Sequence, residues 1–228
     1  MNNLIYSYIN YYFLIINFIF GNDRCIKCSK LCINSLCKTC KLNILNKSKY
    51  LKIDETNFNH FNRVYFDEVY SVDTYTDLFF LIKEYKFNNK IYLSYFLSHL
   101  LNNLIKKYSI DFDLIINIPN HDFLQYTLYL ALNLSKIYKK PILNFISILN
   151  KKQKQHFIEN KDDRIKNVKN KYILKKIIKT NNLNKNKIDI LLLDDIIKTG
   201  ATINEVSKLI KENIKTISKI KVISLAKA

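Results

Sequence analysis

The stretch Leu191-Leu-Leu-Asp-Asp-Ile-Ile-Lys-Thr-Gly-Ala-Thr202 constrains the local fold of this chain more than any other part of the sequence. An apolar run ends in two adjacent acids, Asp194 and Asp195, and the segment after Gly200 has apolar side chains at helical spacing. The chain has only two glycines among its 228 residues, so Gly200 is not filler. This order predicts a buried strand, an acidic pair, a tight loop and a helix.

The helix is expected to begin at Thr202, because Glu205 follows it at the spacing of a capping box. A helix N-terminus with free N–H groups, a glycine and hydroxyl side chains is typical of a phosphate-binding site. Two carboxylates beside it can accept hydrogen bonds from a pair of ribose hydroxyls. An ordinary strand followed by a well-capped helix is the alternative interpretation.

The same stretch resembles the phosphoribosyl pyrophosphate (PRPP) motif of type I phosphoribosyltransferases. The resemblance implies that Asp194 and Asp195 hold the ribose 2′- and 3′-hydroxyls, and that Mg²⁺ accompanies PRPP. Lys198 stands where Thr is commoner, which keeps the loop backbone and adds a cation. By the same resemblance, five consecutive residues wrap the 5′-phosphate: Lys198, Thr199, Gly200, Ala201 and Thr202.

All five cysteines lie within residues 25–40. The pairs Cys25-x2-Cys28 and Cys37-x2-Cys40 are separated by eight residues, and four thiolates arranged this way predict a closed, tetrahedral zinc site. A closed site has no open coordination position, so its expected role is structural. Cys32 is interpreted as a bystander in the intervening turn. A disulfide framework is the alternative, although nothing else in the chain indicates secretion.

The net charge of +18 favours polyanionic partners, namely phosphorylated ligands, nucleic acid or an anionic membrane. Only Arg24, Arg63 and Arg164 are arginine among the 37 basic residues, so a compositionally biased genome is the alternative explanation. The apolar segment 4–20 is slightly short for a membrane span and lacks the basic start and cleavage site of a signal peptide. We expect a packed helix there, with membrane contact as the alternative, in a soluble cytoplasmic protein.

Strand and helix patterns alternate along the rest of the chain, which predicts a parallel sheet of α/β type. Ligands of such sheets lie at the carboxyl ends of the strands. The expected division is an apolar helix with a zinc knuckle over 1–42, a polar linker over 43–62 and the α/β domain over 63–228. The patterns predict strands over 64–72, 112–118 and 141–148, and helices over 74–85, 91–108 and 123–138.

The segment from Lys151 to Lys171 is highly charged and has no apolar periodicity. A solvated surface hairpin is one interpretation of such a run. A mobile lid that closes over a phosphorylated substrate is the other.

The layout of an apolar helix, a four-cysteine knuckle and a phosphoribosyltransferase domain resembles the ComF family of competence proteins. Similar stretches include Phe18 to Cys28, Leu81 to Phe87, and Gln155 followed by Arg164-x-x-Asn167. The resemblance implies that Gln155, Arg164 and Asn167 are catalytic residues of a flexible loop. It also implies a bacterial role in natural competence and DNA uptake, with single-stranded DNA or competence proteins as partners. The alternative function is a non-catalytic, PRPP-sensing or nucleic-acid-binding protein that contains zinc.

The chain departs from that family after Pro119, where the family carries a basic loop with Arg-Gly-Phe-Asn-Gln. Here the segment reads Asn120-His-Asp-Phe-Leu-Gln125 and contains neither Arg nor Gly. In phosphoribosyltransferases this loop cradles pyrophosphate. We therefore expect ligand binding with little phosphoribosyl transfer.

Overall fold

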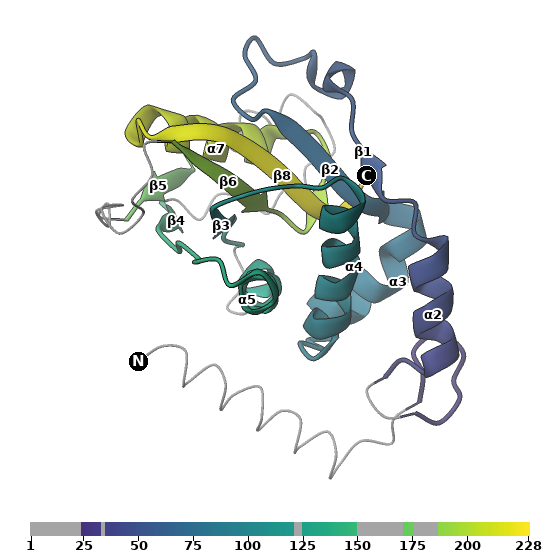
Figure 1. Cartoon of the computed structure of the whole chain (residues 1–228). Coiled ribbons are helices and arrows are strands. Elements are labelled where there is room, and N and C mark those ends of the chain that lie inside the picture. The colour runs from purple at the N-terminus through teal and green to yellow at the C-terminus, as the bar shows by residue number, and fades with distance from the viewer. Residues whose placement is uncertain (1–23, 33–34, 121–124, 150–170, 176–186) are drawn as a thin grey trace, which may run out of the picture.

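The structure is a computed structural model that describes residues 24–32, 35–120, 125–149, 171–175 and 187–228. Within these residues, five α-helices and eight strands form an α/β fold with a mostly parallel sheet (Figure 1). This confirms the predicted fold class at that level. The apolar segment 4–20 and the three residues Gln155, Arg164 and Asn167 lie outside the described residues.

The main sheet has the strand order β1-β2-β8-β6-β3. The strands β2, β8, β6 and β3 are parallel to one another, whereas β1 pairs antiparallel with β2 at one edge. The short strand β7 also pairs with β8, beyond the point where β6 ends. The strands span Leu51–Lys52 (β1), Glu68–Thr74 (β2), Leu114–Asn117 (β3), Ile188–Leu193 (β6), Ile196–Ile197 (β7) and Ile217–Lys227 (β8).

Helices cover both faces of the sheet, so its inner strands are apolar on both sides. In β6, Leu191 and Leu193 pack with the three helices α3, α4 and α5, whereas Ile190 and Leu192 pack with α7. Thr74 caps α3, because its hydroxyl accepts a hydrogen bond from the Asp77 N–H. The helices span Lys38–Lys47 (α2), Tyr75–Lys86 (α3), Leu93–Lys107 (α4), Tyr126–Tyr138 (α5) and Ala201–Asn213 (α7).

A separate two-stranded hairpin packs on the α7 side of the sheet. It consists of β4 (Ile146–Ile148) and β5 (Tyr172–Leu174), which pair antiparallel. Phe145, Ile146 and Tyr172 are buried in the same apolar cluster as α7. This hairpin replaces the longer strand predicted over 141–148, of which residues 141–145 form only an isolated bridge between Ile142 and Ile115.

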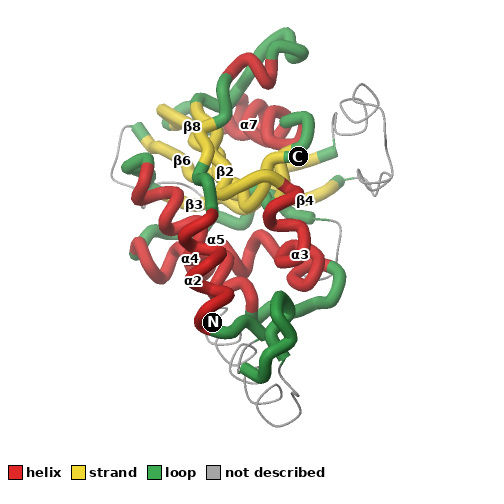
Figure 2. Tube along the Cα trace, turned by 90° about the vertical axis from the view of Figure 1, so that its right-hand side faces the viewer, coloured by secondary structure: helices red, strands yellow, loops and turns green. Residues whose placement is uncertain are grey.

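The segment 43–62, which was predicted as a polar linker, contains regular structure. It carries the end of α2, the strand β1 and the short 3₁₀ helix η1 (Glu55–Phe58). Phe58 is 1% exposed and belongs to the cluster beneath α7. Leu36 and Ile44, on either side of the last cysteine, are buried in the same cluster as α3 and α4. The cysteine module is therefore packed onto the domain rather than tethered to it, and Figures 1 and 2 both place α2 next to α4.

The predicted strand over 64–72 begins four residues later, at Glu68, because the preceding residues follow the surface toward α7. The helix predicted over 123–138 is described from Tyr126 onward. In the described part of the chain, no helix has the length and apolar character needed to cross a membrane.

Candidate functional site

The acidic pair, Asp194 and Asp195, lies between the end of β6 and the start of β7. Both residues are held to β8 by the backbone: the Asp194 N–H donates to the Ile223 carbonyl at 3.1 Å, and the Asp195 carbonyl accepts from Leu225 N–H at 3.1 Å. Both carboxylates are buried, with residue exposures of 9% for Asp194 and 8% for Asp195. The predicted acids therefore sit at the carboxyl edge of the central parallel strands, as expected for a ligand site in such a sheet.

The positive charges of two lysines offset the negative charge of these carboxylates. Lys86, at the end of α3, places its Nζ 2.5 Å from Asp195 Oδ2, and the two side chains are 19% and 11% exposed. Burial, followed by the negative charge of Asp195, raises the pKa of Asp194 to about 7. The positive charges of Lys86 and Lys171 act in the opposite direction. Asp194 is thus poised to exchange a proton near neutral pH.

Lys171 and Tyr172 bring the β4–β5 hairpin to the acidic pair. Lys171 is only 2% exposed, which is rare for a lysine without a nearby negative charge. Burial, and then the charge of Asp194, raise the pKa of Tyr172, whereas a hydrogen bond with Thr202 lowers it. The hairpin, the acidic pair and the first turn of α7 therefore meet at one place. Lys171 has no distinguishing signal in the sequence, because it stands at the end of a long run of charged residues.

The loop before α7 differs from the predicted capping box. The helix begins at Ala201, Gly200 is its N-cap and no side chain caps it, so Thr202 lies inside the first turn. A hydroxyl that precedes the helix bonds its first N–H instead: Thr199 Oγ1 accepts from Ala201 N–H at 3.3 Å. The capping-box prediction is wrong because the chain makes the turn through a left-handed glycine instead of through Thr202.

Gly200 has two reasons to be glycine. Its φ is +83°, a conformation that side chains resist. A Cβ on Gly200 would also lie 2.7 Å from Cε1 of Phe58. The loop thus rests directly on the ring of a residue from the segment that the sequence predicted as a linker.

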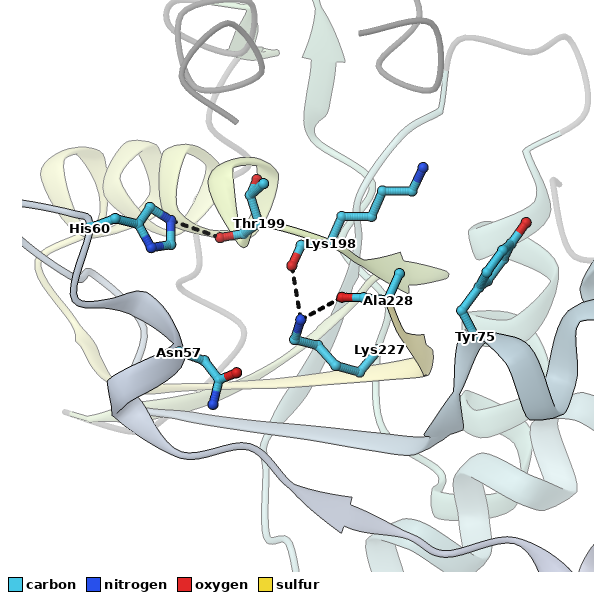
Figure 3. Close-up of a pocket in the computed structure, with 7 residues that line it drawn as sticks. All are labelled: Asn57, His60, Tyr75, Lys198, Thr199, Lys227 and Ala228. Atoms are coloured by element: carbon cyan, nitrogen blue, oxygen red, sulfur yellow. Dashed lines mark hydrogen bonds between the residues drawn. The ribbon is translucent and has the colours of Figure 1, made fainter. Parts of the chain in front are cut away.

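The other side of this loop faces a pocket of about 520 Å³ (Figure 3). His60 Nε2 donates to the Thr199 carbonyl at 3.0 Å, and Lys227 Nζ donates to the Lys198 carbonyl at 3.1 Å. Figure 3 shows the side chains of Lys198 and Thr199 extending away from Lys227. The pocket lies between η1, the start of α3 and the ends of β7 and β8, and it is lined by Asn57, His60, Tyr75, Lys198, Thr199, Lys227 and Ala228.

The four predicted zinc ligands come together. The Sγ atoms of Cys25, Cys28, Cys37 and Cys40 all lie within 4.8 Å of one another, and those of Cys28 and Cys37 are 3.7 Å apart. A tetrahedral zinc with Zn–S bonds of about 2.3 Å needs sulfur atoms about 3.8 Å apart. The cluster is compatible with a structural metal, and Cys32 is not part of it.

Local structure explains how the cysteines converge. Ser29 adopts a left-handed conformation, with φ of 59°, and its N–H donates to the Cys25 carbonyl at 2.8 Å, which closes the first turn. Cys37 is the N-cap of α2, where its Sγ accepts from Cys40 N–H at 3.4 Å. Burial opposes ionisation, but backbone donors, Cys37 N–H first, lower the pKa of Cys25 to about 6 overall. Burial and the neighbouring thiols raise the pKa of Cys40, so a cation is needed to hold all four as thiolates.

The segment after Pro119 is described only at its two ends. The side-chain amide of Gln125 donates to the Asn120 carbonyl at 3.2 Å, which joins these two ends. The predicted catalytic residues Gln155, Arg164 and Asn167 lie outside the described residues. The site therefore consists of the acidic pair, Lys86, Lys171 and the loop from Lys198 to Thr202.

Neither protein-family models nor curated proteins match this chain. The features that define it are an α/β fold, a buried acidic pair at the carboxyl edge of its sheet and a four-cysteine cluster.

Proposed function

We propose that this chain binds a phosphorylated ribose, PRPP or ribose 5-phosphate, at the edge formed by Asp194, Asp195 and the loop Lys198–Thr202. The single observation that carries the proposal is the order of groups along this edge. Two buried carboxylates are followed by a left-handed glycine and a helix N-terminus whose N-cap residue has no side chain, where only the Ala201 N–H is bonded by the Thr199 hydroxyl. Acceptors for a diol and donors for a phosphate thus stand next to each other.

The carboxylates supply the ribose half of the proposed site. Lys86 offsets the charge of Asp195, so this carboxylate is tolerated in a buried position while its oxygens still accept hydrogen bonds. With its pKa near 7, Asp194 accepts two hydroxyl hydrogen bonds once it has lost its proton. Binding of a ribose diol would therefore release protons near neutral pH.

The loop supplies the phosphate half. The first N–H groups of α7 have no partner inside the helix, and the helix dipole favours an anion at this end. Lys198 adds a cation within the loop, and Lys171 stands beside Asp194. The structural zinc proposed for the four cysteines lies in a different module and takes no part in this recognition.

Mg²⁺ is proposed to enter with PRPP rather than to occupy a prepared protein site. Among the described residues, the four cysteines are the only group of three or more His, Cys, Asp or Glu side chains close enough to hold a metal. Asp194 and Asp195 are two carboxylates already facing lysines, so the oxygens of PRPP would supply most of the ligands. The chain's own contribution is to orient the ribose and the 5′-phosphate.

We further propose that phosphoribosyl transfer is weak. Stabilising a departing pyrophosphate needs donors in the loop after Pro119, and the sequence there has no Arg or Gly. Loss of one such donor typically costs about a hundredfold or more in rate. Any transfer that occurs would use Gln155, Arg164 and Asn167, as the ComF resemblance implies.

The cellular role that this resemblance implies is the handling of DNA in natural competence, and we keep it as a proposal. A net charge of +18 supports a polyanionic partner such as single-stranded DNA. The same charge supports the second candidate function, a nucleic-acid-binding protein that senses PRPP without turning it over. Exchange of labelled pyrophosphate into PRPP separates the two, because only a transferase promotes it.

Calorimetry with ribose 5-phosphate and with inorganic phosphate tests the binding proposal. Asp195→Asn should weaken ribose 5-phosphate about tenfold and leave inorganic phosphate unchanged, because only the sugar contacts the carboxylate. Asp189→Asn is the matched control, because Asp189 lies at the other end of the same strand. Wild-type protein that binds ribose 5-phosphate no more tightly than inorganic phosphate would contradict the proposal.

A further inference from the structure

We infer that His60 and Lys227 are positioning residues for the phosphate loop: they hold two consecutive carbonyl groups on the pocket side, so that the next N–H groups face the ligand side. The inference rests on the proposed phosphate site and adds the means by which its donors are oriented. Neither residue would contact the ligand. Both act on the peptide groups between Lys198 and Gly200.

The geometry of the peptide bond carries the argument. In a trans peptide the C=O and the N–H point in opposite directions, and the described residues contain no cis peptide bond. Lys227 Nζ holds the Lys198 carbonyl at 3.1 Å, so the N–H of Thr199 points away from Lys227. His60 Nε2 holds the Thr199 carbonyl at 3.0 Å, so the N–H of Gly200 points away from His60. A carbonyl oxygen only accepts, which requires His60 Nε2 to carry its proton.

Figure 3 displays both hydrogen bonds, and a third in which Lys227 Nζ donates to the Ala228 carbonyl at 2.6 Å; His60 and Lys227 both line the pocket. The two carbonyl groups point toward His60 and Lys227, and the side chains of Lys198 and Thr199 extend elsewhere. Adjacent N–H groups turned to one side form a concave donor site of the kind that binds phosphate. The peptide groups of the loop are therefore oriented by residues on the pocket side, which the phosphate would not contact.

The two donors are themselves fixed by the fold. Lys227 is the last residue of β8 and pairs in register with Ile197 of β7, immediately before the loop. The ring of His60 packs on that of Phe61, with centroids 4.1 Å apart. Two restrained donors can hold a loop that has a glycine at its centre, whereas mobile ones could not.

The segment that carries His60 is also tied to α7. The Asn204 side chain accepts from Tyr65 N–H at 2.8 Å and donates to the Arg63 carbonyl at 3.0 Å. Phe58 lies beneath Gly200, as described above. Residues 58–65 therefore form a brace along the loop and the first turn of α7, and His60 is its polar contact with the loop.

Paired substitutions separate this role from simple packing. His60→Phe keeps a planar ring and removes the donor, whereas His60→Gln restores an N–H donor at similar reach. Lys227→Met removes the ammonium, and Lys227→Arg restores a cation. The donor-free variants should each bind ribose 5-phosphate about tenfold more weakly than wild type, and the conservative variants should stay within about threefold of it. His99→Phe on α4 and Lys219→Met on β8 are the matched controls.

A second readout needs no ligand. The chain has two glycines, Gly21 and Gly200, so selective ¹⁵N-glycine labelling gives two amide resonances, and Gly21→Ala identifies which is which. The Gly200 amide resonance should shift in His60→Phe and in Lys227→Met relative to wild type, because loss of either bond lets the peptide groups between Lys198 and Gly200 rotate. The Gly21 resonance should remain unchanged and serves as the internal reference.

The two readouts distinguish the inference from the proposed function. If wild type binds ribose 5-phosphate and the donor-free variants bind it equally well, the inference is overturned. If wild type binds no ribose 5-phosphate, the proposed function fails, and the Gly200 amide then decides the inference alone. An unchanged Gly200 resonance in both donor-free variants would overturn it, and a shift that His60→Gln reverses would support it.

Discussion

Lys86 Nζ lies 2.5 Å from Asp195 Oδ2, which ties the last turn of α3 to the carboxyl end of the central strand β6. The side chains are largely buried, so neither charge is well compensated by water. Breaking a buried ion pair by removing one partner is costly, because the other charge is left behind. The pair therefore links stability to the proposed ligand site.

Lys86→Met should destabilise the protein by about 1–3 kcal/mol at pH 8, because it leaves the Asp195 carboxylate without its cation. Urea unfolding measures this change. Adding Asp195→Asn to the same chain should recover most of the loss, since the uncompensated charge is then gone. Lys83→Met on the exposed face of the same helix is the control. Equal destabilisation in the single and double variants would contradict the pairing.

The stability of Asp194→Asn relative to wild type should increase as the pH rises from 4 to 8. The folded protein raises the pKa of Asp194 from 3.8 to about 7, so it retains a proton that the unfolded chain releases. The stability linked to this proton is fully present below pH 3.8 and is lost as the pH rises through about 7. The effect has an upper bound of about 4 kcal/mol. Unfolding curves of both proteins between pH 4 and pH 8 test it, and a difference that does not change with pH would contradict it.

Gly200→Ala should destabilise the protein by about 1–3 kcal/mol, because a side chain at positive φ is strained and its Cβ would meet the ring of Phe58. Combining it with Phe58→Leu separates the two causes. The smaller side chain removes the clash but not the backbone strain, so the destabilisation by Gly200→Ala should shrink in the Phe58→Leu background without vanishing. Thermal unfolding of the four proteins in this cycle provides the measurement. An unchanged penalty in the Phe58→Leu background would exclude the ring contact as a cause.

Purified protein should contain about one zinc per chain, and Cys37→Ser should lose it whereas Cys32→Ser should not. Elemental analysis under reducing conditions measures both. Removing the metal with a chelator should also lower Tm, because Leu36 and Ile44 pack in the core beside α3 and α4. Protein purified under these conditions without zinc would refute the assignment of the metal.

The sequence predicted the elements whose pattern is local. The apolar run of β6 and the helical spacing after Gly200 identify a strand and a helix without any knowledge of the partners. The spacing of the cysteine pairs likewise predicted that four sulfur atoms converge, which the structure confirms. The start of α7 was misplaced, because a glycine can turn the chain where a capping side chain was expected.

The partners of the acidic pair could not be predicted, because they come from distant parts of the chain. Lys86 ends a helix about a hundred residues earlier, and nothing in the charged run before Tyr172 distinguishes Lys171 from its neighbours. The segment 43–62 was misread for a related reason. The many polar side chains of this segment do not indicate that Phe58 contacts Gly200 or that His60 bonds the Thr199 carbonyl. Both contacts join residues that are far apart in the sequence.

The position of β8 has a consequence for the synthesis of this protein. Residues 217–227 form the strand between β2 and β6, yet the ribosome makes them after both neighbours. In a nascent chain that ends before Ile217, β2 and β6 each have an unpaired edge, because the strand that joins them has not been made. The sheet must then close in one late step, and until it does the unfinished chain carries edges able to pair with other chains.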